Sequence, residues 1–253
     1  MLKKPLVITL EELSEEPYAS VMCYPRPSEA ESQKRLKELR KLGVKALEFS
    51  GEKQAFNIPV LGKGCVGVVV IAYVDGEKAA LKVRRVDADR SRMQREAEML
   101  KKANSAGVGP RFLSVSKNFL LMQSIDGDLL PKWLEKRKGK AKARKVLRDV
   151  LEQCWRLDEA GLDHGELSHA PKHIILDQKD EPFIVDFETA SVNRKPSNVT
   201  GICQFLFISG AVADEVAEEL GGKDEKAIIE ALRNYKNDRT RENFGNVLQA
   251  CGL

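Results

Sequence analysis

A glycine-rich stretch from Val60 to Arg85 places the strongest constraint on what this chain can fold into. Its sequence, VLGKGCVGVVVIAYVDGEKAALKVRR, contains the pattern G-x-G-x-x-G-x-V. The pattern is formed by Gly62, Gly64, Gly67 and Val69. A run of β-branched residues follows these glycines and predicts a strand. This argues against a dinucleotide-binding fold, in which a helix follows the glycines directly.

The second half of the stretch predicts a hairpin that carries a lysine. Asp75-Gly76 is a strong turn signal, and the segment 79–83 returns as a second strand. Side chains alternate along a strand, so Ala80 and Lys82 share one face. There a small residue could form the floor of an adenine pocket beside a phosphate-binding ammonium group. An ordinary glycine-rich hairpin is the alternative interpretation.

Composition limits the class of protein. The 253 residues are enough for one domain or two lobes, and 42% are hydrophobic and 32% charged. No apolar run approaches the length of a membrane span, so we expect no membrane partner. The five cysteines are scattered without C-x-x-C spacing, which favours a reducing compartment over disulfides or a zinc site. We therefore expect a cytoplasmic protein, and separately we expect it to be a monomer.

Charge is distributed unevenly along the chain, although the net charge is only +4. Cations gather in residues 132–148, here called the basic stretch, and acids gather in residues 214–225. A charge run is usually a solvated face, but one beside a phosphate-handling site favours nucleic-acid binding. The candidate RNA-binding residues in this stretch are Lys136, Arg137, Lys138, Lys140, Lys142, Arg144 and Lys145.

The segment before the glycine loop predicts a helical extension. Ser28 can cap a helix with Glu31 as its capping-box partner, Leu36 and Leu39 recur at helical spacing, and Gly43 ends the helix. We expect this extension to pack against the neighbouring lobe.

Residues after Lys82 predict a helix, two strands and a hinge. The helix covers residues 90–102, and Glu96 is a candidate partner for Lys82, with Glu98 as the neighbouring alternative. Strands are expected around residues 112–115 and 119–122. A hinge between two lobes is expected at residues 123–127.

Two carboxylates further along suit phosphoryl transfer, which needs a metal ligand and a carboxylate near the acceptor hydroxyl. Asp186 follows a short apolar strand and suits the metal, whereas Glu166, in His-Gly-Glu-Leu, suits the acceptor side. Each alone would be an ordinary surface acid. The ordered set of glycine loop, Lys82, Glu96, Glu166 and Asp186 is specific.

These motifs resemble the atypical protein-kinase-like group that contains the RIO kinases and the KEOPS kinase subunit, over about residues 56–200. The resemblance implies an α+β, bilobal fold with a small antiparallel N-lobe sheet, one N-lobe helix and an abbreviated, mainly helical C-lobe. The implied domains are an N-terminal helical extension (1–55), an N-lobe (56–125) and a C-lobe (126–253).

The catalytic segment departs from the pattern of that group in two ways. Glu166 stands where an aspartate is usual, which adds one methylene of reach. The asparagine that normally binds a second metal is absent at its usual spacing, and His173 stands two residues late. Imidazole is a poor ligand for Mg²⁺. Three roles stay open for His173: a weak metal ligand, a group that positions the acceptor, or a packing residue.

A narrower resemblance concerns the acceptor. The H-G-E-L loop, D-F-E motif, basic stretch and extension are similar to those of archaeal RNA kinases, which phosphorylate a ribose 2′-hydroxyl of tRNA. This resemblance implies tRNA as the substrate, and Arg194 and Lys195 become candidates for holding backbone phosphate. A RIO-like Ser/Thr protein kinase with a protein substrate, and a pseudokinase that binds nucleotide or RNA, are the alternatives.

The implied cofactors are ATP and Mg²⁺, with Mn²⁺ as an alternative metal. Lys82, Glu96, Glu166 and Asp186 are the expected catalytic residues, and Asp186 and His173 the expected metal ligands. The expected nucleotide-binding residues are Gly62, Lys63, Gly64, Gly67, Val69, Ala80, Lys82, Met122, Gln123 and Ile125.

Overall fold

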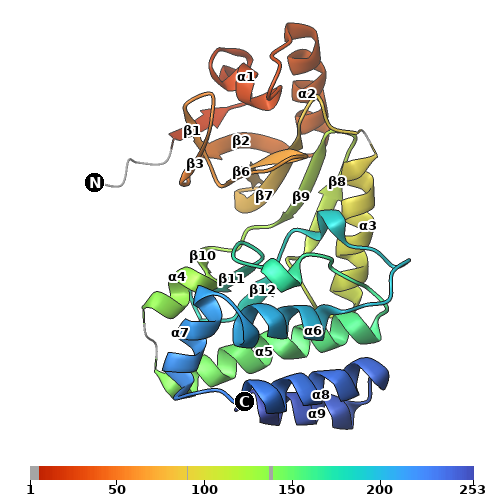
Figure 1. Ribbon diagram of the computed structural model, residues 1–253. Coiled ribbons are helices and arrows are strands. Elements are labelled where there is room, and N and C mark those ends of the chain that lie inside the picture. Colours follow the sequence, from red (N-terminus) through yellow and green to blue (C-terminus); the bar gives the residue numbers. More distant parts are fainter. Residues whose placement is uncertain (1–5, 90, 137–138) are drawn as a thin grey trace. The chain divides into compact units, whose positions relative to one another are not determined.

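The computed structural model describes residues 6–89, 91–136 and 139–253 and divides into two compact units (Figure 1). The first unit contains the residues up to Glu98 together with Arg111–Ser124, and the second contains Met99–Pro110 and Ile125–Leu253. An antiparallel sheet dominates the first and helices the second, which confirms the predicted α+β class. After Arg111–Ser124 the chain returns to the second unit between Ser124 and Ile125, within the segment expected to be a hinge.

The first unit is built on a seven-stranded sheet of order β1-β2-β6-β7-β9-β8, with β5 paired to β6. Its strands are β1 (Leu6–Thr9), β2 (Val44–Phe49), β5 (Gly62–Lys63), β6 (Gly67–Val74), β7 (Glu77–Arg84), β8 (Phe112–Val115) and β9 (Phe119–Gln123). A separate hairpin is formed by β3 (Lys53–Ala55) and β4 (Ile58–Val60). Asp75 and Gly76 have φ of 50° and 84°, as the predicted tight turn between β6 and β7 requires.

The two faces of this sheet have different partners. On one face, Val70 and Leu81 belong to an apolar core that also includes Leu36 and Leu39 of α2 (Glu29–Lys41). The pairing of β6, β7 and β9 places Lys82 on the opposite face, because residues that alternate along a strand point to opposite sides. The N-terminal extension therefore covers one face and leaves the other for the candidate site.

The extension contains more than the helix that the sequence indicates. Ser28 caps α2 by accepting a hydrogen bond from the backbone N–H of Glu31 at 3.4 Å. The Glu31 carboxylate binds Arg35 rather than completing the expected capping box. A second helix, α1 (Tyr18–Met22), precedes it, and β1 and β2 join the main sheet. Residues before 56 are thus part of the same unit as the residues that follow.

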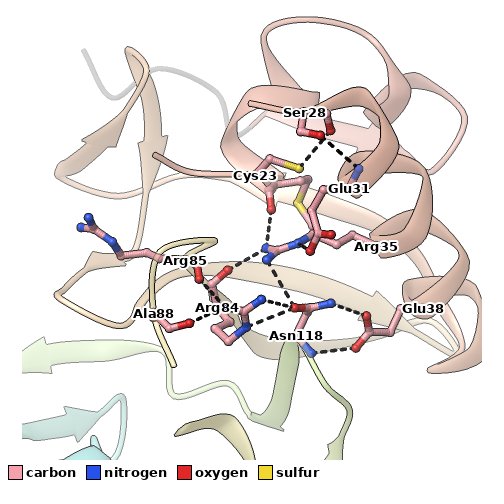
Figure 2. A network of polar contacts seen from close by, with 10 residues as sticks. Cys23, Ser28, Glu31, Arg35, Glu38, Arg84, Arg85, Ala88 and Asn118 are labelled. Carbon is pink, nitrogen blue, oxygen red and sulfur yellow. Dashed lines mark hydrogen bonds and ion pairs between the residues drawn. The ribbon is translucent and has the colours of Figure 1, made fainter. Parts of the chain in front are cut away.

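A buried polar network ties α2 to β7 and to the turn before β9 (Figure 2). Arg35 is completely buried. Its guanidinium donates to the carbonyl oxygens of Met22 and Arg84 at 2.6 Å each and to Asn118 Oδ1 at 3.3 Å. Arg84 donates to the same Asn118 oxygen at 2.7 and 3.1 Å, and to the carbonyl of Ala88 at 2.6 Å. The network therefore fixes the end of the strand that carries Lys82.

Helices and a small sheet form the second unit. The sheet has the order β10-β11-β12. Its strands are β10 (Gly127–Leu129), β11 (Ile174–Asp177) and β12 (Pro182–Ile184). The helices are α4 (Leu130–Glu135), α5 (Lys140–Glu159), α6 (Asn198–Cys203), α7 (Ala211–Leu220), α8 (Glu225–Asn237) and α9 (Arg241–Ala250).

The long helix α5 is the centre of this unit. It begins at Lys140, within the basic stretch, and buries an apolar face that includes Val146, Val150 and Leu157. Helix α6 packs against it, and α8 and α9 lie side by side (Figure 1). Among the described residues no single helix is long and apolar enough to cross a membrane, although the bent pair Asn198–Ile208 and Ala211–Leu220 meets those criteria jointly.

Candidate active site

The glycine loop connects β5 to β6 and closes on itself. The backbone N–H of Gly64 donates to the carbonyl oxygen of Gly67 at 2.9 Å. A Cβ atom at Gly67 would lie 3.0 Å from Lys82 Cγ, so the lysine stem fills the space that a side chain there would need. Near Gly64 the closest atom to such a Cβ is 4.0 Å away. Packing against Lys82 therefore requires a residue without a side chain at Gly67. At Gly64 no such contact exists, and the missing side chain lets the backbone approach a ligand closely.

Lys82 forms a buried ion pair with Glu96 of α3 (Arg92–Ser105). Its Nζ lies 2.8 Å from Oε2 and 2.9 Å from Oε1, and the two side chains are 7% and 3% exposed. Glu98, the alternative in the sequence, is on the exposed side of the helix. Removing two charges from water is costly, so a buried pair of this kind serves to hold a charge in place rather than to add stability.

The start of α3 is held against the sheet by apolar contacts. Met93 and Ala97 are fully buried and pack with Val66 of the glycine loop and with Leu120 of β9. Because Ala97 adjoins Glu96, this packing fixes the glutamate against the strand lysine. The helix that carries Glu96 therefore also supplies the apolar contacts that hold the Lys82–Glu96 ion pair in place.

The sheet register gathers the residues expected around adenine. Ala80 pairs with Met122 and Lys82 pairs with Leu120, while Val69 lies opposite Lys82 on the other neighbouring strand. Directly paired residues point to the same face. Val69, Ala80, Lys82 and Met122 therefore share one face, and each of the three apolar members is partly exposed.

Two further residues of the expected nucleotide pocket lie where the chain passes from the first unit to the second. Gln123 ends β9, and its backbone N–H donates to the carbonyl oxygen of Arg111 at 2.8 Å. Its side-chain oxygen accepts from the Arg111 N–H at 3.1 Å. Ile125 is the first residue of the longer segment of the second unit and is partly exposed.

In the second unit, a hairpin places His173 beside Asp186. Ile174 of β11 pairs with Ile184 of β12, and the backbone N–H of Val185 donates to the carbonyl of His173 at 2.9 Å. The residue before one strand therefore lies next to the residue after the other. Asp186 has a left-handed backbone, with φ 68° and ψ 74°, an arrangement that aspartate tolerates better than most residues.

Glu166 completes a group of three ligand-type side chains. His173 Nε2 lies 3.0 Å from Glu166 Oε2 and 3.9 Å from Asp186 Oδ2. Burial lowers the pKa of His173 below its usual value, although the carboxylates of Asp186 and Glu166 oppose this shift. One donor atom from each residue lies within 4.8 Å of the others. The two carboxylates offer the hard oxygen ligands that Mg²⁺ and Mn²⁺ prefer, whereas the imidazole of His173 between them is a weak ligand for such a cation.

The loop that carries Glu166 is fixed by His164, which is completely buried. Its Nε2 lies 3.1 Å from the carbonyl oxygen of Val185, and the Thr189 hydroxyl donates to the carbonyl oxygen of His164 at 2.9 Å. The backbone N–H of His164 donates to Asn198 Oδ1 at 2.8 Å. Burial lowers the pKa of His164 to about 4, so the ring is neutral near pH 7. Glu166 therefore stands on a rigid support.

Asn198 and Asp163 are parts of this support that the sequence did not single out. Both are at least 95% buried. Asn198 also donates to Asp158 and to the carbonyl of Leu162, at 2.8 and 2.7 Å. Asp163 accepts from Ser197 at 3.0 Å. In the sequence, both resemble ordinary polar residues near a turn, and only their burial distinguishes them.

The structure pairs part of the basic stretch with acids that lie outside it in the sequence. Lys136 lies against Asp128, Lys142 lies 2.7 Å from Asp180, and Lys145 lies 2.7 Å from Asp149. Lys140 and Arg144 are exposed, and within the described residues neither has an acidic partner. Arg137 and Lys138 lie outside the described residues.

Arg194 and Lys195 have different surroundings. The Arg194 guanidinium donates to Asp163 at 2.9 Å and to the carbonyl of Thr189 at 2.7 Å, so it braces the loop after Asp186. Lys195 is exposed, and it lines a small pocket of about 150 Å³ together with Lys236 and Arg239. Arg194 is thus paired with a carboxylate, whereas no carboxylate among the described residues pairs with Lys195.

Two comparisons with known proteins show what this chain is similar to. A sequence model of the RIO domain matches residues 54–200. An uncharacterized protein of Methanocaldococcus jannaschii is 33% identical over 117 residues, which cover 46% of this chain and 98% of that protein. The matched domain contains the glycine loop and all three ligand-type residues, whereas the first 53 residues lie outside it.

Proposed function

The chain belongs to the RIO-domain family of atypical kinases, and we propose that it transfers the γ-phosphate of ATP to a ribose 2′-hydroxyl of tRNA. The buried Lys82–Glu96 ion pair is the observation that carries the kinase assignment. An ammonium held at one place and shielded from water is suited to binding phosphate oxygens. The family generally uses ATP and Mg²⁺, and the residues of the candidate site fit both.

The chain's own residues have separate roles in the proposal. Backbone amides of the glycine loop and Lys82 bind the phosphates, and Glu96 orients Lys82. Asp186 and Glu166, with His173 between them, would hold the cation, which when bound neutralises charge on the phosphates. Glu166 also orients the attacking hydroxyl and accepts its proton.

Support for RNA as the acceptor comes from the similarity to archaeal RNA kinases and from the exposed cations of the basic stretch. Lys140 and Arg144 present charge that no described carboxylate offsets. Their contacts with RNA phosphates would give affinity that falls with salt. The shape of the folded RNA would then set the position of the acceptor.

The decisive experiment offers labelled ATP with bulk tRNA and a generic protein acceptor in parallel, with Asp186→Ala as the inactive control. We expect label in tRNA that disappears in the variant. Alkaline hydrolysis then tests the hydroxyl, because a 2′-phosphate blocks cleavage of the adjacent phosphodiester bond. Label in protein alone would overturn the RNA acceptor, and failure to label any acceptor would favour a binding module without catalysis.

A matched pair of charge reversals tests the basic stretch. Lys140→Glu combined with Arg144→Glu should raise the KM for tRNA and reduce its dependence on salt. Lys226→Glu, at an exposed position of α8, is the control and should leave labelling of tRNA unchanged. If the KM for tRNA and its dependence on salt were the same in the two proteins, the basic stretch would be a solvated face.

A further inference from the structure

A second surface beside the glycine loop combines aromatic rings with cations. It consists of Tyr24, Phe56, Lys63 and Arg85, and we call it the Tyr24 surface. Tyr24 follows α1, Phe56 lies in the turn between β3 and β4, Lys63 belongs to β5, and Arg85 follows β7. All four lie in the first unit, and the carbonyl of Tyr24 accepts from the N–H of Val86 at 3.0 Å.

The position of Phe56 is unusual in two respects. Phe56 and Asn57 have φ of 49° and 63°, in the left-handed region that bulky residues rarely adopt. Phe56 is nevertheless 40% exposed, so burial does not compensate for this backbone. Glycine or asparagine would suit the turn better. A residue kept in an unfavourable conformation with its ring in water points to a function for that ring.

The contacts around Tyr24 hold these groups together. The rings of Tyr24 and Phe56 are 5.2 Å apart and meet edge to face, at 62°. Lys63 Nζ lies 5.6 Å from the Tyr24 ring centre and the Arg85 guanidinium lies 5.1 Å from it. Tyr24 is thus engaged on several sides, whereas Phe56 has a free part.

Charge on this surface is positive. Arg85 forms an ion pair with Asp87 at 2.8 Å and also donates to the carbonyl of Gly64 in the glycine loop at 3.4 Å. Lys63 is exposed, and no carboxylate among the described residues pairs with it. Arg26, two residues after Tyr24, is exposed as well. Asp87, whose pKa is lowered by its hydrogen bond with Arg85 and also by the charge of Arg26, faces two cations. The surface therefore keeps a net positive charge, and Lys63 remains available to a ligand.

We propose that the Tyr24 surface binds an unpaired nucleotide of the RNA substrate, with the base stacked on Phe56 and the adjoining phosphates near Lys63 and Arg26. Aromatic rings beside cations are the means by which proteins bind single-stranded RNA. The inference builds on the proposed function, since it names a binding site for the same acceptor. Phe56, Lys63 and Arg85 lie within the matched RIO domain, whereas Tyr24 and Arg26 lie outside it, so the extension completes a site that the domain begins.

Phe56→Ala is the direct test, and Leu113→Ala is the matched control because Leu113 is another exposed apolar residue of the same unit, 38% exposed. Loss of one stacked base should weaken tRNA binding about 5- to 150-fold in Phe56→Ala. Leu113→Ala should bind tRNA as the unchanged protein does. Thermal melting of each variant shows whether it is folded.

Phe56→Trp supplies a readout that does not depend on activity. Its indole should restore tRNA affinity, and its fluorescence should be quenched on titration with tRNA, beyond any change of the two native tryptophans in the unchanged protein. Emission from the introduced indole that does not respond to bound tRNA would overturn the proposal.

The outcomes separate this site from the proposed function. Transfer of phosphate to tRNA with equal affinities for Phe56→Ala and Leu113→Ala would overturn the Tyr24 surface and leave the RNA kinase intact. If RNA binding depends on Phe56 but phosphate is transferred only to protein, the Tyr24 surface stands as an RNA-binding site. The proposal that tRNA is the phosphate acceptor is then overturned. A loss of ATP affinity in Phe56→Ala as large as the loss of tRNA affinity would show that Phe56 supports the glycine loop instead.

Discussion

Glu38 of α2 binds Asn118 through two donors: its carboxylate accepts the backbone N–H and the side-chain N–H of Asn118 at 2.7 Å each. These bonds leave the amide oxygen of Asn118 facing Arg35 and Arg84, both of which donate to it. One side-chain oxygen thereby serves two buried cations. The extension, the strand of Lys82 and the turn before β9 meet at this atom.

Replacing Asn118 by alanine should cost about 3 kcal/mol of unfolding free energy, because two buried guanidinium groups lose an acceptor. Chemical denaturation checks the value. Asn193→Ala, at an exposed position, is the control and should change stability by less than about 0.5 kcal/mol. Similar values for both variants would show that the network contributes little.

The Lys82–Glu96 pair allows a test that separates stability from chemistry. Glu96→Leu removes the carboxylate 2.8 Å from a buried ammonium and should destabilise the protein by about 3–5 kcal/mol. Adding Lys82→Met should recover most of this loss, because the buried ammonium that lost the Glu96 carboxylate is then removed as well. Both proteins should be inactive in phosphate transfer. A double variant as unstable as the single one would contradict this account.

Acid should unfold the protein partly through His164. Its pKa is lowered to about 4 in the folded protein, against about 6.5 in the unfolded chain, so the unfolded state takes up a proton first as pH falls. The contribution of His164 to the unfolding free energy is therefore complete above pH 6.5 and declines toward pH 4. Between pH 7 and pH 5 the unfolding free energy should fall by about 2 kcal/mol for this reason.

His164→Asn should abolish that part of the pH dependence. Unfolding free energies at pH 7 and pH 5 give the comparison, and His169→Asn is the control because His169 is exposed. If His164→Asn lost as much stability between the two pH values as His169→Asn does, the buried ring would not be the group that titrates.

Two glycines should respond to alanine in opposite directions. Gly165, beside Glu166, has φ of 90°, and a Cβ there would lie 2.5 Å from Arg194 Nη2 and 3.1 Å from Thr189 Oγ1. Gly165→Ala should lower both stability and phosphate transfer. Gly245 lies within α9 with no atom within 4 Å of such a Cβ, so Gly245→Ala should stabilise the protein by about 0.8 kcal/mol. Thermal melting of both variants checks the signs.

The sequence predicted the parts of the site that depend on local patterns. Strand alternation put Ala80 and Lys82 on one face, and the helix after them carried Glu96 at the correct place. His173 could not be assigned, since its position depends on the register between β11 and β12.

Long-range contacts account for what sequence reasoning missed. Arg35 looks like a solvated charge on an amphipathic helix, yet it is completely buried and bonded to residues 49 and 83 positions away. Likewise, Lys142 of the basic stretch is paired with Asp180, 38 residues on. Neither partnership leaves a pattern in the local sequence, because folding alone brings these groups together.

The covered face of the first sheet has a consequence for how much of this chain can be removed. Truncation at residue 54 would keep the whole matched RIO domain and still expose Val70, Leu81 and their apolar neighbours, which α2 buries. It would also delete β2, leaving residues 71–74 of β6 as an unpaired edge open to other chains. A shortened protein of this kind should aggregate, so in this chain the segment that the family shares is not the smallest piece that stays in solution.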